Sequence, residues 1–348
     1  MTTDSIESLQ GAKLLAALEE QALKGEPAPI HLCLRLAETI GESGTEASSE
    51  NSDWNSGLFG ALCDAADKIR EQLHGDTADT CSIVNGRSGR CTEDCKWCAQ
   101  SCRHHTGCQE YDFVSEEEYF ATMHANDSAG VRRFSIVCSG RKVAMNDIKR
   151  YCDLYRRTKE TSGMSLCASM GLLNREELQE LYDAGVRRYH CNLETSASYF
   201  PTLCTTHTRE DKLRTIRLAQ EVGMEVCSGG IIGMGETLRQ RLEMAAESRD
   251  AGSISIPVNL LNPIKGTPLQ DIPLISERDV VLTVALMRLV APRQTIRFAG
   301  GRARMSREAT VRMLRGGVNG AIVGDMLTTI GNAMDEDRKL FASVGLKL

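Results

Sequence analysis

Hydrophobic and polar positions follow two rhythms along this chain. From about residue 131 onward, short apolar runs alternate with charged stretches in which apolar residues recur every three or four positions. The runs predict buried strands, and the stretches predict amphipathic helices. With "TCSIVNG" at 80–86 the chain has eight such runs. The other seven are "VRRFSIVCS", "MSLCASMG", "VRRYHCNLE", "EVCSGGIIG", "SISIPVNLL", "QTIRFAGG" and "GVNGAIVG".

A strand followed by a helix, repeated eight times, predicts an α/β fold, a (β/α)8 barrel of the TIM type. A doubly wound open sheet is the alternative, but it does not require eight near-equal units. N-cap signals mark the predicted helix starts at Ser115 with Glu118, Asn146, Asn174 with Glu177, Thr208, Thr237 with Gln240, Ser276 and Ser306. The predicted helix ends are marked by Gly130, Gly163, Gly185, Gly223, Gly252, Gly316 and Pro292.

The first 75 residues follow a different pattern. Helices are predicted over about 11–23, 28–40 and 55–74, and the polar stretch "GESGTEASSENSD" between the last two is predicted to be mobile. We therefore expect an N-terminal helical extension over 1–75, a barrel over 76–330 and a C-terminal helical tail over 331–348. The extension is expected to pack on the barrel or on a second subunit.

Composition narrows the classes of function. The chain has 348 residues, 41% of them hydrophobic, and a net charge of −6, which gives no general attraction to nucleic acids or anionic membranes. It has no apolar run of eighteen residues and no basic leader, so a cytoplasmic protein is expected. Fourteen cysteines in a chain of this kind indicate metal or cluster chemistry more than a disulfide scaffold.

Three of the cysteines form a CxxxCxxC array in "RCTEDCKWCAQSC". Cys91, Cys95 and Cys98 are separated by polar residues, which indicates a ligand loop and not core packing. Structural zinc takes four ligands, often as two CxxC pairs, and no second pair follows. A 4Fe-4S cluster held by three cysteines leaves one iron open to a substrate or cofactor. The alternative is that Cys102 or Cys108 completes a zinc site or an ordinary electron-transfer cluster.

This array, with the aromatic Trp97 before its last cysteine and a strand before it, resembles the signature of the radical S-adenosylmethionine (SAM) enzymes. The resemblance implies that the open iron binds the methionine amine and carboxylate of SAM. An electron from the cluster then cleaves the sulfonium and releases a 5′-deoxyadenosyl radical. Trp97, Ser139 and Gly140 are expected beside this cofactor, the last two through backbone groups.

Within that superfamily, residues 78–335 resemble the biotin synthase family. The motifs are "GRCTEDCKWCAQS", "CNLETS", "CTTHT", "VCSGGIIGMGET", "VNLLNPIKGTPL" and "IRFAGGR". The resemblance implies sulfur insertion between two unactivated carbons of dethiobiotin. It also implies a low-potential electron donor such as flavodoxin or ferredoxin, and a homodimer.

A second, auxiliary iron–sulfur cluster that donates the sulfur is implied as well. The family binds it through cysteines on the second, third and fifth strands and an arginine on the seventh; Cys167, Cys227 and Arg297 match the last three positions. Ser135 stands at the second-strand position, with Cys138 three residues later. Strand alternation turns these two to opposite faces, so Cys138 can substitute only if the strand has already ended. The cluster is thus expected to be 2Fe-2S with a displaced ligand, or larger. The alternative for Arg297 is a charge partner of a carboxylate or of SAM.

On the fourth strand, Asn192 and Glu194 share one face by period two. The resemblance assigns Asn192 to the ureido ring of the substrate and Glu194 to the ribose hydroxyls of SAM. It assigns Asn259, in "VNLL", to a second ureido contact. Lys212 stands where the family commonly has an arginine for the SAM carboxylate, so the charge is kept without the bidentate fork. The glycines of "SGGIIGMGE" are expected to let the backbone approach the adenosine.

Three other functions remain open at this stage. One is a rearrangement or maturation enzyme with the same barrel, as in hydrogenase-maturation or methylornithine-forming relatives. Another is a non-enzymatic iron–sulfur carrier, although a carrier needs neither eight barrel units nor an open iron. The third is a protein that has kept the barrel and lost the chemistry, against which the intact cysteine array argues. The remaining thiols, Cys204 among them, are expected to be packing or incidental, and the role of Cys81 is uncertain.

Overall fold

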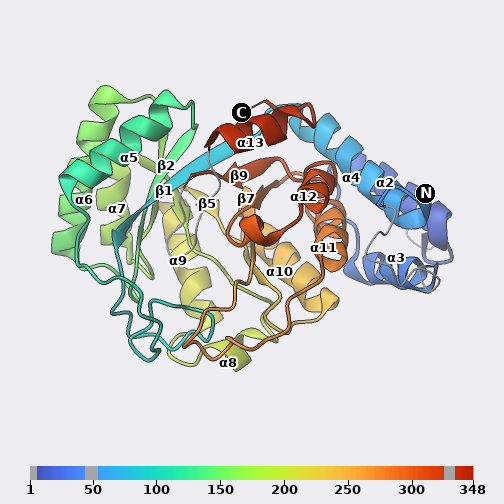
Figure 1. Ribbon diagram of the computed structural model, residues 1–348, viewed down its shortest axis with the longest axis horizontal. Helices are drawn as coiled ribbons and strands as arrows, with labels where there is room; N and C mark the ends of the chain where they lie inside the picture. The colour runs from blue at the N-terminus through green and yellow to red at the C-terminus, as the bar shows by residue number, and fades with distance from the viewer. Residues whose placement is uncertain (1–5, 44–53, 325–333, 348) are drawn as a thin grey trace.

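The computed structural model describes residues 6–43, 54–324 and 334–347. A parallel barrel forms its centre (Figure 1). Its strands are β1 Asp79–Arg87, β2 Arg133–Cys138, β3 Ser165–Ser169, β4 Val186–His190, β5 Glu225–Cys227, β6 Gly230–Ile232, β7 Ser255–Leu260, β8 Thr295–Phe298 and β9 Gly320–Ile322.

The predicted barrel is confirmed. Neighbours pair in parallel from β1 to β5 and from β6 through β9 back to β1, and β5 also pairs with β7, which closes the barrel. β5 and β6 are two halves of one strand, interrupted at Ser228 and Gly229, and both lie against β7. The nine strand segments therefore occupy the eight predicted strand positions.

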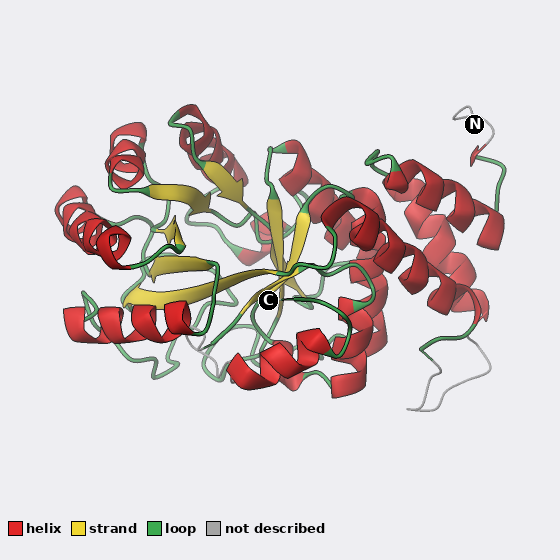
Figure 2. Ribbon diagram, turned by 90° about the horizontal axis from the view of Figure 1, so that it is seen from above, coloured by secondary structure: helices red, strands yellow, loops and turns green. Residues whose placement is uncertain are grey.

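Helices cover the outside of the barrel (Figure 2). Around the strands lie α5 Glu116–Ser128, α6 Met145–Thr161, α7 Arg175–Asp183, α8 Phe200–Leu203, α9 Arg209–Glu221, α10 Leu238–Asp250, α11 Glu277–Val290, the 3-10 turn η1 Arg302–Arg304, and α12 Arg307–Leu314. The N-terminal helices are α2 Gly11–Leu23, α3 Ile30–Ser43 and α4 Gly57–His74, and α13 Met334–Ala342 follows the barrel.

The cap signals were right at most helix starts. The predicted side chains of Ser115, Asn174, Thr208, Thr237, Ser276 and Ser306 all accept a backbone N–H in the first turn. Asn146 is the exception, because α6 starts at Met145 after Ala144 and Asn146 lies inside the helix. Gly163 and Gly316 also lack the left-handed backbone of a C-terminal cap. α6 ends instead on Ser162 in an extended conformation, and Gly317 takes the left-handed position after α12.

The N-terminal helices pack on one side of the barrel ring, against α11 and α10 (Figure 1). The Ala28 N–H donates to the Leu289 carbonyl (2.9 Å), and the Arg293 guanidinium donates to the Lys24 carbonyl (2.8 Å). α11 is buried on nearly all sides as a result. Of the polar stretch predicted to be mobile, 44–53 lie outside the described residues. No helix in the described part of the chain is long and apolar enough to cross a membrane.

Candidate functional site

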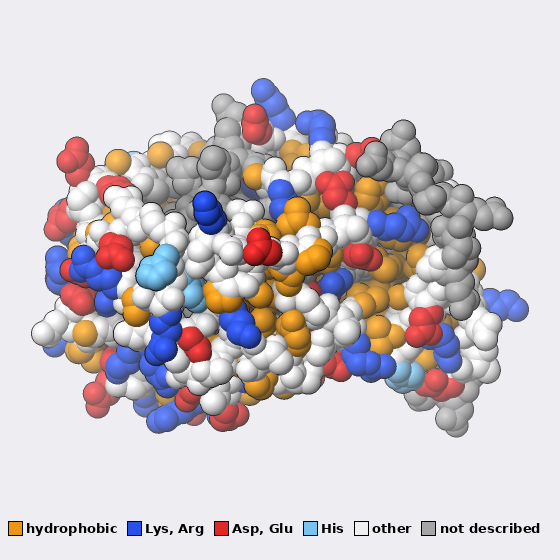
Figure 3. Space-filling view, turned by 60° about the horizontal axis from the view of Figure 1, so that its bottom comes forward, with side chains coloured by type: hydrophobic (Ala, Val, Ile, Leu, Met, Phe, Trp, Pro, Cys, Tyr) orange, Lys and Arg blue, Asp and Glu red, His pale blue; other side chains and the backbone are white. Residues whose placement is uncertain are grey.

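A cavity of about 450 Å³ opens inside the barrel toward the carboxyl ends of the strands, where reactive groups gather in parallel barrels. Every candidate site residue predicted from the sequence lines it. The loops around its mouth lie at the lower edge of Figure 1. On the face that Figure 3 brings forward, acidic and basic side chains are intermixed, with hydrophobic side chains between them. That face carries no single-sign patch that would attract a polyanion.

The cysteine array occupies the loop after β1. Backbone N–H groups of Glu93 and Gly140 donate to the Cys91 sulfur, and that of Gln100 donates to Cys98. Burial raises the pKa of Cys98 to about 11, so only a cation or iron would hold it as a thiolate at neutral pH. N–H groups aimed at sulfur are typical of cluster thiolates. The Gly140 N–H is therefore directed at the Cys91 sulfur.

The three array sulfurs are not gathered around one point that a single metal ion could occupy, although the Cys95 sulfur lies within 4.8 Å of ligand atoms of Cys204 and His207. Two sulfurs bound to one ion at about 2.3 Å lie no more than about 4.6 Å apart. Among the described residues, the sulfurs of Cys91, Cys95 and Cys98 do not all lie within 4.8 Å of one another. Separate corners of a polynuclear cluster fit this wider spacing, so the donor set suits the cluster that the sequence predicts.

A turn at residues 204–207, between α8 and α9, holds the array loop in place. Asp94 accepts the backbone N–H groups of Thr205 (2.9 Å) and Thr206 (3.2 Å). Glu93 contacts His207, with 2.6 Å between Nδ1 and Oε2, and both side chains are buried. Burial raises the pKa of Glu93, but hydrogen bonds from Thr206 and His207 outweigh it, so the net shift is downward. Both acids are thus held as anions against the turn.

The same turn brings a further cysteine to the array. Cys204 is 3% exposed, and its sulfur lies 3.7 Å from that of Cys95 and 3.3 Å from His207 Nδ1. The sequence reading treated Cys204 as incidental because it lies more than a hundred positions from the array. The motif "CTTHT", in which the cysteine precedes the clamping residues, was the available signal.

Glu194 and Lys212 meet in the cavity wall. The Lys212 Nζ lies 3.8 Å from Glu194 Oε1. Burial lowers the pKa of Lys212, but the charges of Glu194 and of nearby cysteines together outweigh it and raise the pKa. Glu194 has φ +72°, a left-handed conformation that costs a non-glycine residue on the order of 1–3 kcal/mol. Its N–H donates to the Gly229 carbonyl (3.0 Å) and its carbonyl accepts from Ile231 (2.8 Å), which hold it there. Such strain gathers at ligand sites.

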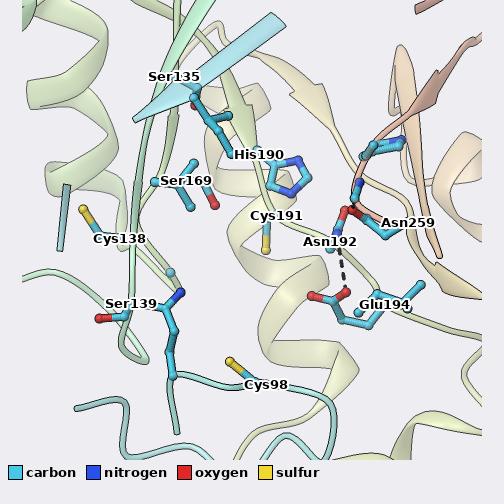
Figure 4. Close-up of a pocket in the computed structure, with 18 of the residues that line it drawn as sticks. Cys98, Ser135, Cys138, Ser139, Ser169, His190, Cys191, Asn192, Glu194 and Asn259 are labelled. Carbon is cyan, nitrogen blue, oxygen red and sulfur yellow. Dashed lines mark hydrogen bonds between the residues drawn. The ribbon is translucent and has the colours of Figure 1, made fainter. Parts of the chain in front are cut away.

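The two predicted asparagines flank the break between β5 and β6 (Figure 4). Asn192 accepts the Gly229 N–H (3.1 Å) and donates to Glu194 (3.3 Å). Asn259 donates to the Gly230 carbonyl (3.1 Å) and accepts the Gly300 N–H (2.9 Å). An amide has two N–H groups and two acceptor lone pairs, so each side chain retains one of each for a ligand.

The glycines of this break have a structural reason that differs from the one predicted. A Cβ on Gly229 would clash with the Pro257 carbonyl oxygen, and a Cβ on Gly230 would clash with the Glu194 carbonyl oxygen. Neighbouring backbone therefore requires glycine at both positions. The approach of the backbone to adenosine stays a prediction, and these contacts give both glycines a structural role besides it.

The remaining predicted cofactor residues lie at the cavity rim. Trp97 packs beside the small apolar cluster of Leu203, Met234 and Leu261. The Ser139 hydroxyl donates to the Gly89 carbonyl (2.7 Å), which ties the end of β2 to the array loop. Ser139 therefore positions the loop, and the array stays next to the cavity.

Deeper in the barrel lies a second group of thiols. Cys81 on β1 shares a hydrogen bond with Cys167 on β3, which raises the pKa of Cys81 and lowers that of Cys167. Cys227 on β5 shares one with His190. Burial raises the pKa of Cys227, but His190 and the charges of nearby arginines lower it to about 7. The sequence reading left the role of Cys81 uncertain, because period two alone does not say which face of β1 looks inward.

Arg297 forms the floor beside these thiols. Its Nη2 donates to Asp79 Oδ2 (2.7 Å), its Nη1 to the carbonyls of Asp79 (2.7 Å) and Ala321 (3.1 Å), and its Nε to Ser255 (3.4 Å). Burial lowers the pKa of Arg297, but the Asp79 charge and the nearby cysteines outweigh it and raise it. Four of the five N–H groups are thus directed at acceptors. This geometry favours the charge-partner alternative for Arg297.

Asp79 gathers two further arginines at the same floor. Arg133 Nε lies 2.9 Å from Asp79 Oδ1, and Arg188 Nη1 lies 3.1 Å from Oδ2. Burial raises the pKa of Asp79, but the charges of Arg297, Arg133 and Arg188 lower it to about 2. Arg188 also pairs with Glu225 (2.9 Å), so three cations face two carboxylates. The excess of positive charge around Cys81, Cys167 and Cys227 suits thiolates.

Cys138 does not take the place of the missing second-strand cysteine. β2 runs through Cys138, so the condition that the strand has ended is not met. Cys138 contributes to the cavity lining, but its thiol is directed at Tyr151 of α6, and Figure 4 shows its sulfur pointing away from His190. Ser135 faces the cavity as predicted and offers a hydroxyl in place of a thiol.

Comparisons with known proteins agree with this geometry. Residues 87–247 match the family model of the Radical SAM superfamily, and residues 257–347 match the Biotin and Thiamin Synthesis associated domain. The biotin synthase of Parabacteroides distasonis is 47% identical over 288 residues, 83% of this chain and 88% of that protein. The biotin synthase of Porphyromonas gingivalis is 48% identical over 288 residues, 83% of this chain and 87% of that protein.

Solved structures show the same fold. A crystal structure of methylornithine synthase has a TM-score of 0.77 at 18% identity and covers 95% of this chain and 96% of its own. A hydrogenase maturase has a TM-score of 0.74 at 16% identity and covers 99% of this chain and 76% of its own. At these identities the likeness concerns the barrel alone.

Proposed function

Because the chain belongs to the biotin synthase family of radical SAM enzymes, we propose that it inserts a sulfur atom between two unactivated carbons of dethiobiotin to form biotin. The observation that carries the proposal is one cavity lined by two separate sets of three cysteines. The first set is Cys91, Cys95 and Cys98, and the second is Cys81, Cys167 and Cys227. Biotin formation in this family requires a radical and a sulfur donor, and the two sets offer a place for each.

At the first set, Cys91, Cys95 and Cys98 would hold a 4Fe-4S cluster. When bound, that cluster supplies an open iron for SAM and the electron that releases the 5′-deoxyadenosyl radical. The chain orients the cofactor with Glu194, whose carboxylate accepts from the ribose hydroxyls, and with Lys212, whose cation faces the SAM carboxylate. Trp97 and the backbone around Ser139 exclude water from this end of the cavity.

At the second set, we assign Cys81 in place of the second-strand cysteine that the resemblance implies, beside Cys167 and Cys227. These thiolates would hold the auxiliary cluster, which supplies the sulfur when bound. Arg297 stays a cation in this assignment, and its charge offsets that of the thiolates. A third cysteine from β1 fits either a 2Fe-2S cluster or a larger one.

Between the two sets, Asn192 and Asn259 are assigned to the ureido ring of dethiobiotin. Each amide has one N–H group and one lone pair left over after its hydrogen bonds to backbone and, for Asn192, to Glu194, and a ureido group offers matching acceptors and donors. Their hydrogen bonds to the backbone at residues 229, 230 and 300 fix the amide planes, so the substrate carbons are presented in one orientation.

The partners follow from the family. We include a low-potential electron donor such as flavodoxin or ferredoxin, and a homodimer. We also place the enzyme in the cytoplasm, which the fourteen free cysteines support because thiols stay reduced there.

The deciding experiment is an anaerobic assay of the reconstituted protein with dethiobiotin, SAM and a strong reductant. Biotin and 5′-deoxyadenosine are both expected, and both should vanish in Cys95→Ala. Formation of 5′-deoxyadenosine without biotin would contradict sulfur insertion and favour a rearrangement enzyme. Absence of 5′-deoxyadenosine from the wild-type protein would favour an iron–sulfur carrier.

A further inference from the structure

We propose that Cys204 is a positioning residue whose S–H group donates a hydrogen bond to the Cys95 thiolate and thereby raises the reduction potential of the cluster at the array. The inference rests on the proposed function, because it needs Cys95 as an iron ligand. Cys204 follows α8 directly, is 3% exposed, and its sulfur lies 3.7 Å from the Cys95 sulfur. That separation is within hydrogen-bonding range for two sulfurs.

Iron decides which of the two sulfurs keeps the proton. With both side chains as thiols, Cys95 donates to Cys204. Iron binds the thiolate, so an iron-bound Cys95 has no proton to give. The only proton available to this contact in the loaded enzyme is that of Cys204, and the direction of the hydrogen bond reverses.

The first competing acceptor for that proton is Asp94, whose Oδ1 lies 3.3 Å from the Cys204 sulfur. Oδ1 already accepts the backbone N–H groups of Thr205 (2.9 Å) and Thr206 (3.2 Å). The Thr205 hydroxyl donates to the other oxygen, Oδ2. Because the lone pairs of Oδ1 are filled by backbone donors, Asp94 has little capacity left for the weak S–H donor.

The second competitor is His207, whose Nδ1 lies 3.3 Å from the Cys204 sulfur. The same nitrogen lies 2.6 Å from the Glu93 carboxylate, so it carries a proton and acts as a donor. Nδ1 therefore cannot also accept from Cys204, and the other ring nitrogen, Nε2, lies 3.9 Å from the Cys204 sulfur, farther than the Cys95 sulfur at 3.7 Å. The third is the Thr206 hydroxyl at 3.7 Å, which already accepts the Asp94 N–H at 3.1 Å. The Cys95 thiolate is then the charged acceptor left for Cys204.

Hydrogen bonds to the sulfurs of an iron–sulfur cluster help set its potential, because they stabilise the more negative, reduced state. Cys91 and Cys98 receive theirs from backbone N–H groups, which side-chain substitution does not remove. The donor to Cys95 is a side chain, so this contribution can be removed by mutation. By raising the reduction potential, this hydrogen bond makes the cluster easier for the electron donor to reduce.

The test compares Cys204→Ala and Cys204→Ser with wild type in the full-length, anaerobically reconstituted protein. Cys152→Ala is the matched control, because Cys152 is a fully buried thiol on α6. Iron content and the midpoint potential are measured for each, the latter from the EPR signal of the reduced cluster that changes when SAM is added. That signal reports the array cluster and not the auxiliary one.

The midpoint of Cys204→Ala is expected to shift to more negative potential, whereas Cys204→Ser and Cys152→Ala match wild type, since a serine hydroxyl still donates. Equal midpoints in Cys204→Ala and Cys152→Ala at equal iron content would overturn the proposal. If Cys204→Ala loses the iron of the array cluster, the test depends on Cys204→Ser. A wild-type midpoint potential in Cys204→Ser supports a hydrogen-bond donor. Loss of iron from Cys204→Ser overturns the proposal and indicates that Cys204 is an iron ligand. A shifted midpoint without biotin formation would contradict only the proposed sulfur insertion.

Discussion

Single residues decide which thiols belong to the auxiliary site. Cys138 is the residue that the sequence offers for the position that Ser135 leaves open, and Cys81 is the one that we assign to it. They face different partners: Cys81 shares a hydrogen bond with Cys167, and Cys138 shares one with Tyr151. We expect Cys81→Ala to lower the iron and sulfide content per chain and to abolish biotin formation while 5′-deoxyadenosine is still made. The first set of cysteines is untouched by this change.

Cys138→Ala is the matched control for that experiment. It removes a buried thiol of the same size about one strand away, so it should leave iron, sulfide and both products at wild-type levels. Loss of iron from Cys138→Ala, or an unchanged sulfide content in Cys81→Ala, would remove Cys81 from the ligand set.

Gly230 is needed for the left-handed backbone conformation of Glu194. A Cβ at Gly230 would clash with the Glu194 carbonyl oxygen, which the Ile231 N–H holds at 2.8 Å. Gly230→Ala should therefore move Glu194 and weaken SAM binding by about tenfold, roughly 1.4 kcal/mol. Gly163→Ala is the control, because a Cβ there has no neighbour within 4 Å. Equal SAM dissociation constants for the two variants, measured by equilibrium dialysis, would show that Gly230 is not needed for this geometry.

How far the sequence predicts residues depends on whether a local pattern exists. Cys91, Cys95 and Cys98 are recognisable because they share one loop, and Asn192 with Glu194 because they share one strand face. Cys204 reaches Cys95 only through the barrel, and Arg188 reaches Asp79 across three strands. The spacing of residues along the sequence does not predict such contacts, so they can be recognised only in the folded barrel.

Elements were predicted best where a backbone hydrogen bond is satisfied locally. The capping box of Asn174 and Glu177 is formed in both directions at the start of α7, and the similar expectation for Asn146 is wrong. The β5–β6 interruption was also missed, because "EVCSGGIIG" reads as one apolar run. The break depends on tertiary contacts, because the carbonyl oxygens of Pro257 and Glu194 lie where a Cβ would stand on Gly229 and Gly230.

The contrast between the two asparagines gives a prediction. Asn174→Ala removes a cap worth about 1 kcal/mol, so amides in the first turn of α7 should exchange with deuterium roughly fivefold faster. Asn146→Ala replaces an exposed helix-interior residue with a better helix former and should leave the exchange of α6 unchanged or slower. Equal acceleration in both helices, followed by mass spectrometry, would mean that Asn174 does not cap α7.

At the scale of the whole molecule, the N-terminal helices and the barrel behave as one packed body. Their junction is built on Arg288, a fully buried residue of α11. Its guanidinium donates to the carbonyls of Pro292 (3.0 Å) and Gly317 (2.6 Å), and its Nη1 lies 3.0 Å from His74 Nε2 at the end of α4. The sequence predicted the three helices but left open what they pack on, because an apolar helix face does not specify the surface that it packs against.

This junction makes the stability of the protein depend on pH. Burial, and then the Arg288 charge, lower the pKa of His74 to about 4 in the folded state. The unfolded chain protonates this ring near pH 6.5, so between about pH 6.5 and 4 the unfolded state binds a proton that the folded state does not. Stability is therefore expected to fall as the pH drops through this window. We expect a loss of roughly 2 kcal/mol after allowance for partial exposure of the ring.

His74→Gln should remove that dependence, because glutamine keeps a polar group at the junction without a titrating one. Urea midpoints of wild type and His74→Gln, measured between pH 7 and 5, should diverge as the pH falls, with the variant flatter. His124→Gln, at an exposed position on α5, should follow the wild-type curve. If His74→Gln and wild type run parallel, the His74 ring is not buried against Arg288, and the packing of α4 on α11 described above is wrong at its central contact.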